Sequence, residues 1–401
     1  MTPDRDTPAP SEVFPGRSDA ELAQRGAACT AREIAQQPVV WQQVARLLER
    51  EQSRLGRYLG PLLADPALRI VLTGAGTSAF IGECLAPALA RQLRRRVDAI
   101  ATTDLVTGPH LHLQRDVPTL LVSFARSGNS PESVATIDLA EQVLDQRHHL
   151  IVTCNADGAL ATRAAGLRSA QLIVLPEATN DRGFAMTSSF SSMLLAASLV
   201  FGVIATAAVP RLAEAGRGAM ARAHPLAERL AEQRFERVVY LGSNELRGLA
   251  FEAALKLLEL TDGQTVAIGD SVLGFRHGPK TIINARTLVV VFQSSDSHAR
   301  TYERDLLAEL RRDACAGAVL SLGARGDSRD STQSVFEGVD CANDIEVALL
   351  SVLFAQIYAL RQSLTMGLTP DRPNAAGVVN RVVQGVTIHP WLLDQVDVPG
   401  R

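Results

Sequence analysis

The chain has 401 residues, enough for two or three domains, and a formal net charge of −3. This charge argues against nucleic-acid binding, because phosphate backbones require a basic protein face. Hydrophobic residues make up 46% of the chain and charged residues 21%, as in an ordinary globular protein with a sizeable core.

The cysteines and the N-terminal residues indicate the compartment. The five cysteines are scattered and form no CxxC pair, so neither a zinc site nor a disulfide framework is indicated. Residues 1–19 lack the apolar core of a signal peptide, and we expect residues 1–20 to be a flexible, proline-rich lead. We therefore expect a cytoplasmic protein with reduced thiols.

Helices and strands alternate along the first half. Thr30-Ala-Arg-Glu33 resembles a capping box, and the apolar spacing after it predicts helix over 30–60. Helices are then expected from Thr77 and over 131–145. Short apolar runs predict strands at 69–74, 97–102, 118–124, 150–155 and 171–177. This alternation is typical of a parallel sheet covered by helices on both faces.

One apolar segment tests the expectation that the chain avoids membranes. Residues 193–209 contain no charged residue, and their length lies at the lower edge of a membrane span. The segment is nevertheless rich in alanine, carries Ser, Gly and Thr, and has no aromatic residues at its ends. We expect a helix buried between layers of the protein.

The pattern then starts again. It predicts strands at 237–243, 287–295 and 317–323, and helices at 245–260, 299–313 and 345–364. Gly74 and Gly242 are 168 residues apart, and Phe124 and Phe292 are separated by the same offset. Two strand-to-loop junctions with one offset indicate an internal duplication.

Two hydroxyl-rich loops in the first half, "TGAGTS" and "SFARSGNS", follow predicted strands and precede predicted helices. Ligands of open parallel sheets bind at this edge, and helix N-termini attract phosphate. Neither loop contains lysine, which favours a monophosphate over a triphosphate with magnesium. The predicted phosphate-binding residues are Gly76, Thr77, Ser78, Ser123, Arg126, Ser127, Gly128 and Ser130.

Two other interpretations of these loops stay open. Ser130 is also placed to cap the helix that begins at Pro131, but capping leaves Ser123 and Ser127 unexplained. "GAGTSA" also fits the dinucleotide pattern G-x-G-x-x-A, with Asp98 as the ribose-binding carboxylate. The second hydroxyl-rich loop favours a small phosphate.

The first half resembles a sugar-isomerase (SIS) domain, and the duplication is similar to the tandem pair in the isomerase part of glucosamine-6-phosphate synthase. The resemblance covers about residues 30–390. It implies an α/β fold of two tandem SIS domains, each a flavodoxin-like parallel sheet sandwiched by helices. After a helical segment at 21–60, the first domain is expected at 61–208 and the second, with a C-terminal tail, at 209–401. The loop "ATNDRGFAMTSSF" (178–190) also resembles a family loop, which implies that Thr187 and Ser188 line the site.

Three charged residues in "EAALKLLEL" suggest acid–base chemistry in the second half. Glu252, Lys256 and Glu259 share one helical face, and their apolar neighbours predict partial burial, which raises a carboxyl pKa toward the range of a general base. The alternative is a surface ion-pair stripe. A histidine follows in "GFRHGPK", and although a lone histidine is more often structural, His277 is a candidate because it lies close behind this helix.

The resemblance to the synthase implies roles for these residues. "EAALKLLEL…RHGP" is similar to the family pattern "EGALKLKE…KHGP". Glu259 then matches the glutamate that moves a proton between C1 and C2, and Lys256 a lysine near the site. His277 matches the histidine that opens the sugar ring from the neighbouring subunit, which implies a homodimer or larger assembly.

One departure from the synthase narrows the expected reaction. Gln384 lies near the place of the lysine that forms a Schiff base in the synthase, and the glutaminase half is absent. An amino sugar already carries its nitrogen and needs no such lysine. The whole chain, including "NRVVQGVTIHP", more closely resembles the bacterial galactosamine-6-phosphate deaminases, also described as tagatose-6-phosphate ketose/aldose isomerases.

The expected enzyme therefore converts galactosamine 6-phosphate to tagatose 6-phosphate and ammonia without a metal or organic cofactor. A plain ketose–aldose isomerase would use the same groups, and glucosamine 6-phosphate differs from the expected substrate only at C4. A non-catalytic sugar-phosphate sensor is the alternative from another class, since SIS domains also occur in regulators. The retained Glu259 and His277 favour an enzyme.

Overall fold

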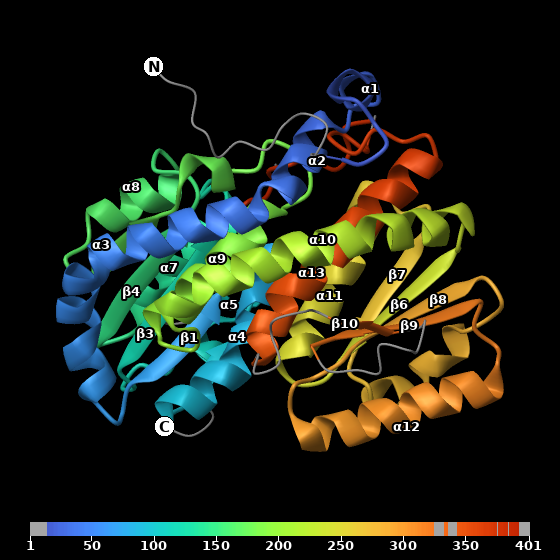
Figure 1. Cartoon of the computed structure of the whole chain (residues 1–401). Helices are drawn as coiled ribbons and strands as arrows, with labels where there is room; N and C mark the ends of the chain where they lie inside the picture. The colour runs from blue at the N-terminus through green and yellow to red at the C-terminus, as the bar shows by residue number, and fades with distance from the viewer. Residues whose placement is uncertain (1–13, 325–332, 336–342, 375, 384, 393–401) are drawn as a thin grey trace.

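The computed structural model describes residues 14–324, 333–335, 343–374, 376–383 and 385–392. Its chain begins with a helical segment that packs over the first half (Figure 1). This segment contains α1 (Asp19–Gln24), α2 (Ala28–Ala35) and α3 (Gln37–Ala64). The helix predicted over 30–60 is therefore confirmed, with a break at Gln36.

The first half contains a five-stranded parallel sheet in the order β2-β1-β3-β4-β5. β1 and β3 are buried along their whole lengths, because helices cover both faces of the sheet. The strands are β1 (Arg69–Thr73), β2 (Val97–Ala99), β3 (Thr119–Ala125), β4 (Arg147–Thr153) and β5 (Ala170–Val174). The helices are α4 (Thr77–Leu93), α5 (Thr102–Thr107), α6 (Pro109–His112), α7 (Pro131–Val143), α8 (Ala159–Ala165) and α9 (Ser188–Val200).

The second half repeats this arrangement in the order β10-β9-β8-β6-β7. Counted along the chain from β6, the strand order is that of the first sheet, the flavodoxin-like order. The strands are β6 (Arg237–Gly242), β7 (Val266–Asp270), β8 (Thr287–Phe292), β9 (Ala318–Gly323) and β10 (Gln333–Val335). The helices are α10 (Val209–Glu232), α11 (Glu245–Leu260), α12 (Ser297–Asp313) and α13 (Asp344–Thr365).

The strand register carries the same duplication. Thr73 pairs with Ser123 in the first sheet, and Leu241 pairs with Val291 in the second. Both partners are shifted by 168 residues, the offset seen in the sequence. The predicted α/β fold with two tandem parallel sheets is confirmed.

Glycine at the end of β1 and of β6 has a steric cause. A Cβ atom on Gly74 would lie 2.6 Å from a backbone atom of Ser78, and one on Gly242 would lie 2.2 Å from the carbonyl oxygen of Leu246. In each half the strand ends against the first turn of the next helix, so a side chain does not fit there.

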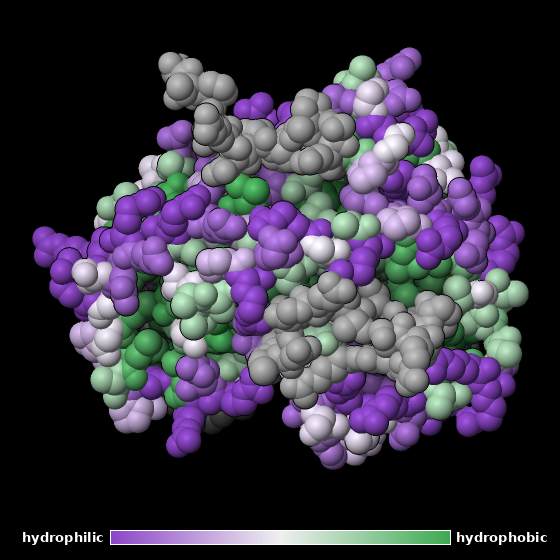
Figure 2. Space-filling model, in the orientation of Figure 1, coloured by the Kyte–Doolittle hydropathy of each residue, from purple (hydrophilic) through white to green (hydrophobic). Residues whose placement is uncertain are grey.

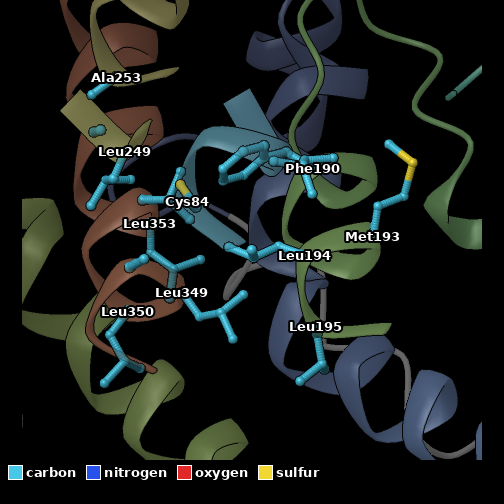
Figure 3. Close-up of a cluster of buried hydrophobic side chains, with 14 of the residues drawn as sticks. Cys84, Phe190, Met193, Leu194, Leu195, Leu249, Ala253, Leu349, Leu350 and Leu353 are labelled. Atoms are coloured by element: carbon cyan, nitrogen blue, oxygen red, sulfur yellow. The ribbon is translucent and has the colours of Figure 1, made fainter. Parts of the chain in front are cut away.

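Helices from both halves pack between the two sheets. Figure 3 shows side chains of α4, α9, α11 and α13 meeting in one buried cluster. Residues of the N-terminal helices belong to the same cluster. One continuous hydrophobic core therefore joins the halves and fixes α11 of the second half against α4 of the first.

The apolar run at 193–209 is not one helix. Its first part belongs to α9, which is buried, and the chain turns before α10 begins at Val209. By length and composition, α13 is the one helix among the described residues that could cross a membrane, and the apolar window is wholly buried inside the protein. A core helix passes the same test, and polar side chains cover most of the face in Figure 2.

Two local predictions were wrong. The capping box at Thr30 does not form, because α2 already begins at Ala28 and the Thr30 hydroxyl group donates to Asp371. The edge strand β7, only five residues long, was not predicted.

Candidate active site

Two open helix N-termini lie at the carboxyl ends of β1 and β3. α4 follows Gly76 and α7 follows Ser130, and neither helix has a side-chain hydrogen bond at its N-cap. The first N–H groups of a helix need a partner from outside the helix and carry partial positive charge, so both N-termini suit an anion.

Buried hydroxyl groups next to these N-termini also lack partners. Thr77 Oγ1 and Ser123 Oγ are buried and make no hydrogen bond, which is unusual for buried polar atoms. Ser78 Oγ has only the Met186 sulfur, at 4.0 Å. The first-half loops therefore combine unused donors from both predicted motifs.

Ser127 and Ser130 lie on the second of these loops and are partly exposed. The backbone N–H of Asn129 donates to Ser127 Oγ over 3.3 Å, and Ser130 Oγ lies 2.6 Å from Ser133 Oγ. The capping interpretation of Ser130 is wrong for its side chain, because that hydroxyl group makes no bond to the backbone of α7. Gly128, the remaining loop residue, is buried.

Arg126 is directed at the protein backbone. Its buried guanidinium group donates to the carbonyl oxygens of Phe184 at 3.1 Å and Arg381 at 2.8 Å, and reaches Gly183 at 3.4 Å. Burial lowers its pKa, while the charges of Asp181 and Glu259 act in the opposite direction. In this structure Arg126 ties three segments together beside Glu259, and phosphate binding by it stays a prediction.

The loop before α9 is held by a buried carboxylate. Asp181 accepts from the backbone N–H groups of Thr187, Ser188 and Ser189, at 2.7, 3.1 and 2.9 Å. The side chains of Thr187 and Ser188 are fully buried, and Ser188 Oγ donates to the Glu33 carbonyl oxygen. These two predicted lining residues contact protein groups here, so their place in the lining is not supported by this geometry.

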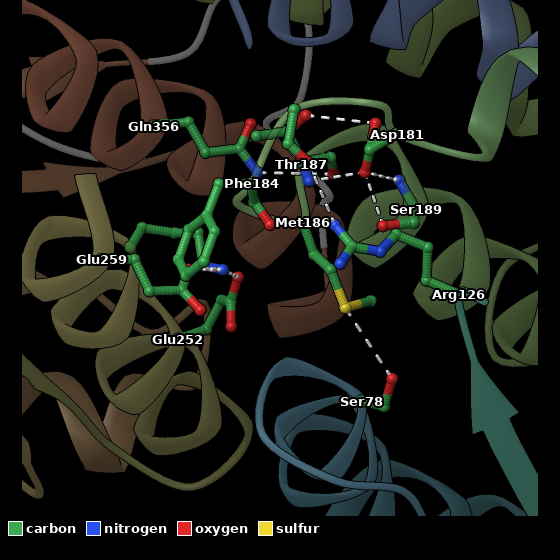
Figure 4. A network of polar contacts seen from close by, with 12 residues as sticks. Ser78, Arg126, Asp181, Phe184, Met186, Thr187, Ser189, Glu252, Glu259 and Gln356 are labelled. Carbon is green, nitrogen blue, oxygen red and sulfur yellow. Dashed lines mark hydrogen bonds and ion pairs between the residues drawn. The ribbon is translucent and has the colours of Figure 1, made fainter. Parts of the chain in front are cut away.

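Phe184 and Met186, two side chains of the same loop, face the site instead. Figure 4 shows them projecting from the loop, Phe184 toward Glu252 and Glu259 and Met186 toward Ser78. Phe184 also borders a cavity of about 210 Å³ beside residues 371–381. No local pattern in the sequence marks either residue, because the direction of their side chains depends on the hydrogen bonds of Asp181 and Arg126.

The charged face of α11 lies against the start of α4. Lys256 is fully buried, forms a short ion pair with Glu259, and lies 3.6 Å from Glu252 Oε1. The side chain of Glu252 is buried, whereas that of Glu259 is 24% exposed. The predicted burial of this face is confirmed, and of the two carboxylates Glu259 is the one with exposed surface.

The electrostatics distinguish the two glutamates. Burial raises the pKa of Glu252 to about 8; Lys256 and Thr77 lower it, and the Glu259 charge raises it further. Although Thr77 acts on this pKa, neither oxygen of Glu252 has a hydrogen bond of good geometry. The residue nevertheless brings α11 into electrostatic contact with the first phosphate loop.

His277 stands apart from this arrangement. It ends a short 3-10 helix (Gly274–His277) after the edge strand β7, and its side chain is exposed. Within the described part of the chain it makes no hydrogen bond or ion pair with the site residues. Gln384 lies outside the described residues.

The dinucleotide interpretation requires a free Asp98 carboxylate to bind the ribose. Asp98 forms ion pairs with Arg69 at 2.6 Å and Arg96 at 2.9 Å, so its carboxylate already has two partners. In the described ranges no group of three or more His, Cys, Asp or Glu residues could hold a metal ion.

Comparisons with known proteins agree with this geometry. The SIS domain family matches residues 62–202. The D-galactosamine-6-phosphate deaminase of Shewanella sp. is 43% identical over 381 residues, which cover 93% of this chain and 94% of that protein. The Escherichia coli protein of the same name is 45% identical and covers 90% of this chain and 96% of its own length.

A solved structure gives the same result. The crystal structure of tagatose-6-phosphate ketose/aldose isomerase from Escherichia coli superposes with a TM-score of 0.85 and is 42% identical. The match covers 90% of this chain and 96% of that one. Sequence and fold therefore agree over nearly the whole length.

Proposed function

The chain belongs to the SIS-domain proteins, in the family of the D-galactosamine-6-phosphate deaminases, and we propose on that premise that it converts D-galactosamine 6-phosphate to D-tagatose 6-phosphate and ammonia. One observation carries the proposal beyond family membership. Thr77, whose hydroxyl group is unpaired at the start of α4, neighbours Glu252. Glu252 lies 3.6 Å from the buried Lys256, the ion-pair partner of the partly exposed Glu259. This arrangement supplies a phosphate anchor and a proton-transfer group in one site.

The reaction requires one proton transfer between neighbouring carbons. The loops hold the 6-phosphate while the open-chain aldehyde lies along α11. Glu259 removes the C2 proton and returns it to C1, while the aldehyde oxygen gains a proton and the amino group loses one, so the product of this step is a ketimine at C2. Water then adds to C2 and ammonia leaves. General acid–base groups of this kind supply about 10²–10⁴-fold each.

Lys256 forms an ion pair with Glu259. The lysine side chain is fully buried, whereas that of Glu259 retains 24% exposure, which leaves this carboxylate open to a substrate. Phe184, beside the pair, covers it with an apolar ring that limits access of bulk water.

The direct test is product analysis. Purified protein is incubated with galactosamine 6-phosphate and, separately, with glucosamine 6-phosphate, and released ammonia is measured. Ammonia from the galacto epimer alone is the expected result and sets the C4 preference. Ammonia from neither would overturn the proposal, and interconversion of galactose 6-phosphate and tagatose 6-phosphate would then identify a plain isomerase.

We also propose that His277 opens the sugar ring in a neighbouring subunit of a homodimer. Its exposed position beyond the edge strand β7, without a contact to Glu259, supports this arrangement. The test mixes two inactive variants, Glu259→Gln and His277→Ala. In a symmetric dimer, donation across the interface makes one site of each mixed dimer complete and restores activity. If the mixture stays inactive although subunits exchange, His277 does not act across the interface.

A further inference from the structure

Glu252 is a buried acid that the proposed proton transfer does not use. Its side chain is 0% exposed, and its carboxyl oxygens have no hydrogen bond of good geometry. It lies where the two halves meet, between Thr77 at the start of α4 and Lys256 on α11.

A carboxyl group at this position is costly for the fold. Burying a polar group without a partner destabilises a protein, and an apolar side chain of similar size would fill the space without that cost. Its neighbours include the thiol of Cys84, whose own pKa burial and the Glu252 charge raise. The charged partner of Glu252 at 3.6 Å is the fully buried Lys256, a residue of the proposed site, so the position of Glu252 points to the reaction.

From these contacts we infer that Glu252 is a positioning residue that holds the ammonium group of Lys256 between the phosphate loop and Glu259. This inference rests on the proposed function. Lys256 has two carboxyl neighbours for one positive charge. The contact with Glu259, three residues later on α11, is the shorter one, and the 3.6 Å contact is with Glu252, four residues earlier.

The proton occupancy of Glu252 decides how the ammonium group is shared. With a pKa of about 8, Glu252 keeps its proton at neutral pH, and Lys256 is then paired with Glu259 alone. Above that pH Glu252 ionises and competes for Lys256. The groups that act on Glu252 are Lys256 and Glu259 from α11 and Thr77 from α4. Cys84 of α4 is also close enough for the Glu252 charge to act on its thiol. The neutral Gln356 of α13 donates to the Thr187 carbonyl oxygen, away from Glu252 (Figure 4).

The contact between Glu252 and Lys256 also holds the ammonium group during turnover. When Glu259 takes up the C2 proton it loses its negative charge, and Lys256 loses its nearest partner. Glu252 is then the remaining carboxyl group within reach of the ammonium group. Loss of the Glu259 charge also removes a cause of the raised Glu252 pKa. Glu252 then gives up its proton to water and pairs with Lys256 as a carboxylate, which glutamine at this position cannot do, and it takes a proton back when Glu259 is ionised again. Lys256 is thereby kept in place until the proton has moved to C1.

The test compares pH profiles of kcat for ammonia release by wild type and Glu252→Gln between pH 6 and 9.5. In the variant we expect kcat at neutral pH to fall by about 10–100-fold while KM changes less than about threefold, because the loss affects the transition state. We also expect the decline of wild-type kcat above about pH 8 to disappear. Glu252→Asp, which keeps the carboxyl group, should restore part of kcat and the alkaline decline.

Glu303→Gln is the matched control, since Glu303 is also a buried carboxyl with a raised pKa of about 7 but lies in the second half beside Ser294. The pH profile of kcat for this variant should equal that of wild type. Thermal unfolding at each pH confirms that the variants are folded. A folded Glu252→Gln protein with the wild-type kcat and alkaline decline would overturn the inference. If wild type releases no ammonia, the proposed function fails. The pH profiles of wild type and Glu252→Gln are then compared for the interconversion of galactose 6-phosphate and tagatose 6-phosphate, which would use the same Lys256–Glu259 pair.

Discussion

In the first half, the loop after β3 leaves its donors open, with Ser123 Oγ unpaired and the N-cap of α7 without a side-chain bond. The loop after β8 is its counterpart, and there carboxylates of the chain fill the same region. Asp344 accepts from Ser294 Oγ and the Ser295 N–H, both at 2.5 Å, and Glu303 accepts from the Ser294 N–H at 3.0 Å. Asp296 caps α12. The duplicated fold therefore leaves these donors open in the first half, whereas internal acids occupy the same region of the second.

The backbone just before α4 in the first half and before α11 in the second shows the same contrast. Gly76 has φ 55° and ψ −127°, and its counterpart Asn244 has φ 51° and ψ −119°. Side chains other than glycine rarely adopt this conformation. The second half keeps the geometry with a strained asparagine, whereas the first half has the residue that lets a ligand approach the backbone.

Glu259→Gln should have the largest effect on turnover. Proton transfer is assigned to Glu259 of the second half, and phosphate binding to the loops of the first. We expect kcat to fall by about 10²–10⁴-fold with little change in affinity for galactosamine 6-phosphate. Steady-state kinetics and calorimetric binding measure the two quantities. Binding that weakens as much as turnover would show that this half also anchors the substrate.

Ser127→Ala and Ser295→Ala remove counterpart hydroxyl groups from the two loops. Loss of one hydrogen bond to a charged group costs about 1.5–3 kcal/mol, so Ser127→Ala should raise KM by roughly 10–100-fold. Ser295→Ala should leave KM unchanged. Equal effects of the two substitutions on KM would contradict the division between the halves.

Gly76→Ala and Asn244→Gly test the shared backbone conformation. A Cβ on Gly76 meets no atom within 4 Å, so Gly76→Ala should lower the free energy of unfolding by about 1–3 kcal/mol through backbone strain alone. Asn244→Gly should raise it slightly, since the relieved strain exceeds the about 0.5–1 kcal/mol of added entropy cost. Chemical denaturation measures both, and stabilisation by Gly76→Ala would refute the argument.

Glu303→Gln should have the smallest effect, on the pH dependence of stability. Burial raises the pKa of Glu303 from its ordinary value of 4.5 to about 7, so the protonated form favours the folded state. That stabilisation is complete below pH 4.5 and is lost as pH rises through 7. The free energy of unfolding of the variant should therefore decline less between pH 5 and 8, by about 1–2 kcal/mol. An identical decline in both proteins would show that Glu303 does not titrate there.

Local patterns in the sequence were enough to predict the buried strands and the main charged groups, but not the edge strands β7 and β10 of the second sheet. Apolar runs identify buried strands, and the spacing of Lys256 and Glu259 places them on one face of α11. Contacts between distant segments have no such pattern. The carboxylate of Glu33 was assigned to a capping box, but it accepts the N–H of Gly183, 150 residues away. Phe184 was missed for the same reason. The domain limits and the cytoplasmic location stay predictions.

The most direct measurement is a crystal structure of Glu259→Gln with galactosamine 6-phosphate. We expect the phosphate at the N-termini of α4 and α7, within hydrogen-bond distance of Ser78, Ser127 and Ser130, and C1 and C2 beside residue 259. A phosphate bound at residues 293–297 of the second half, or a sugar whose C1 and C2 lie away from α11, would contradict the account.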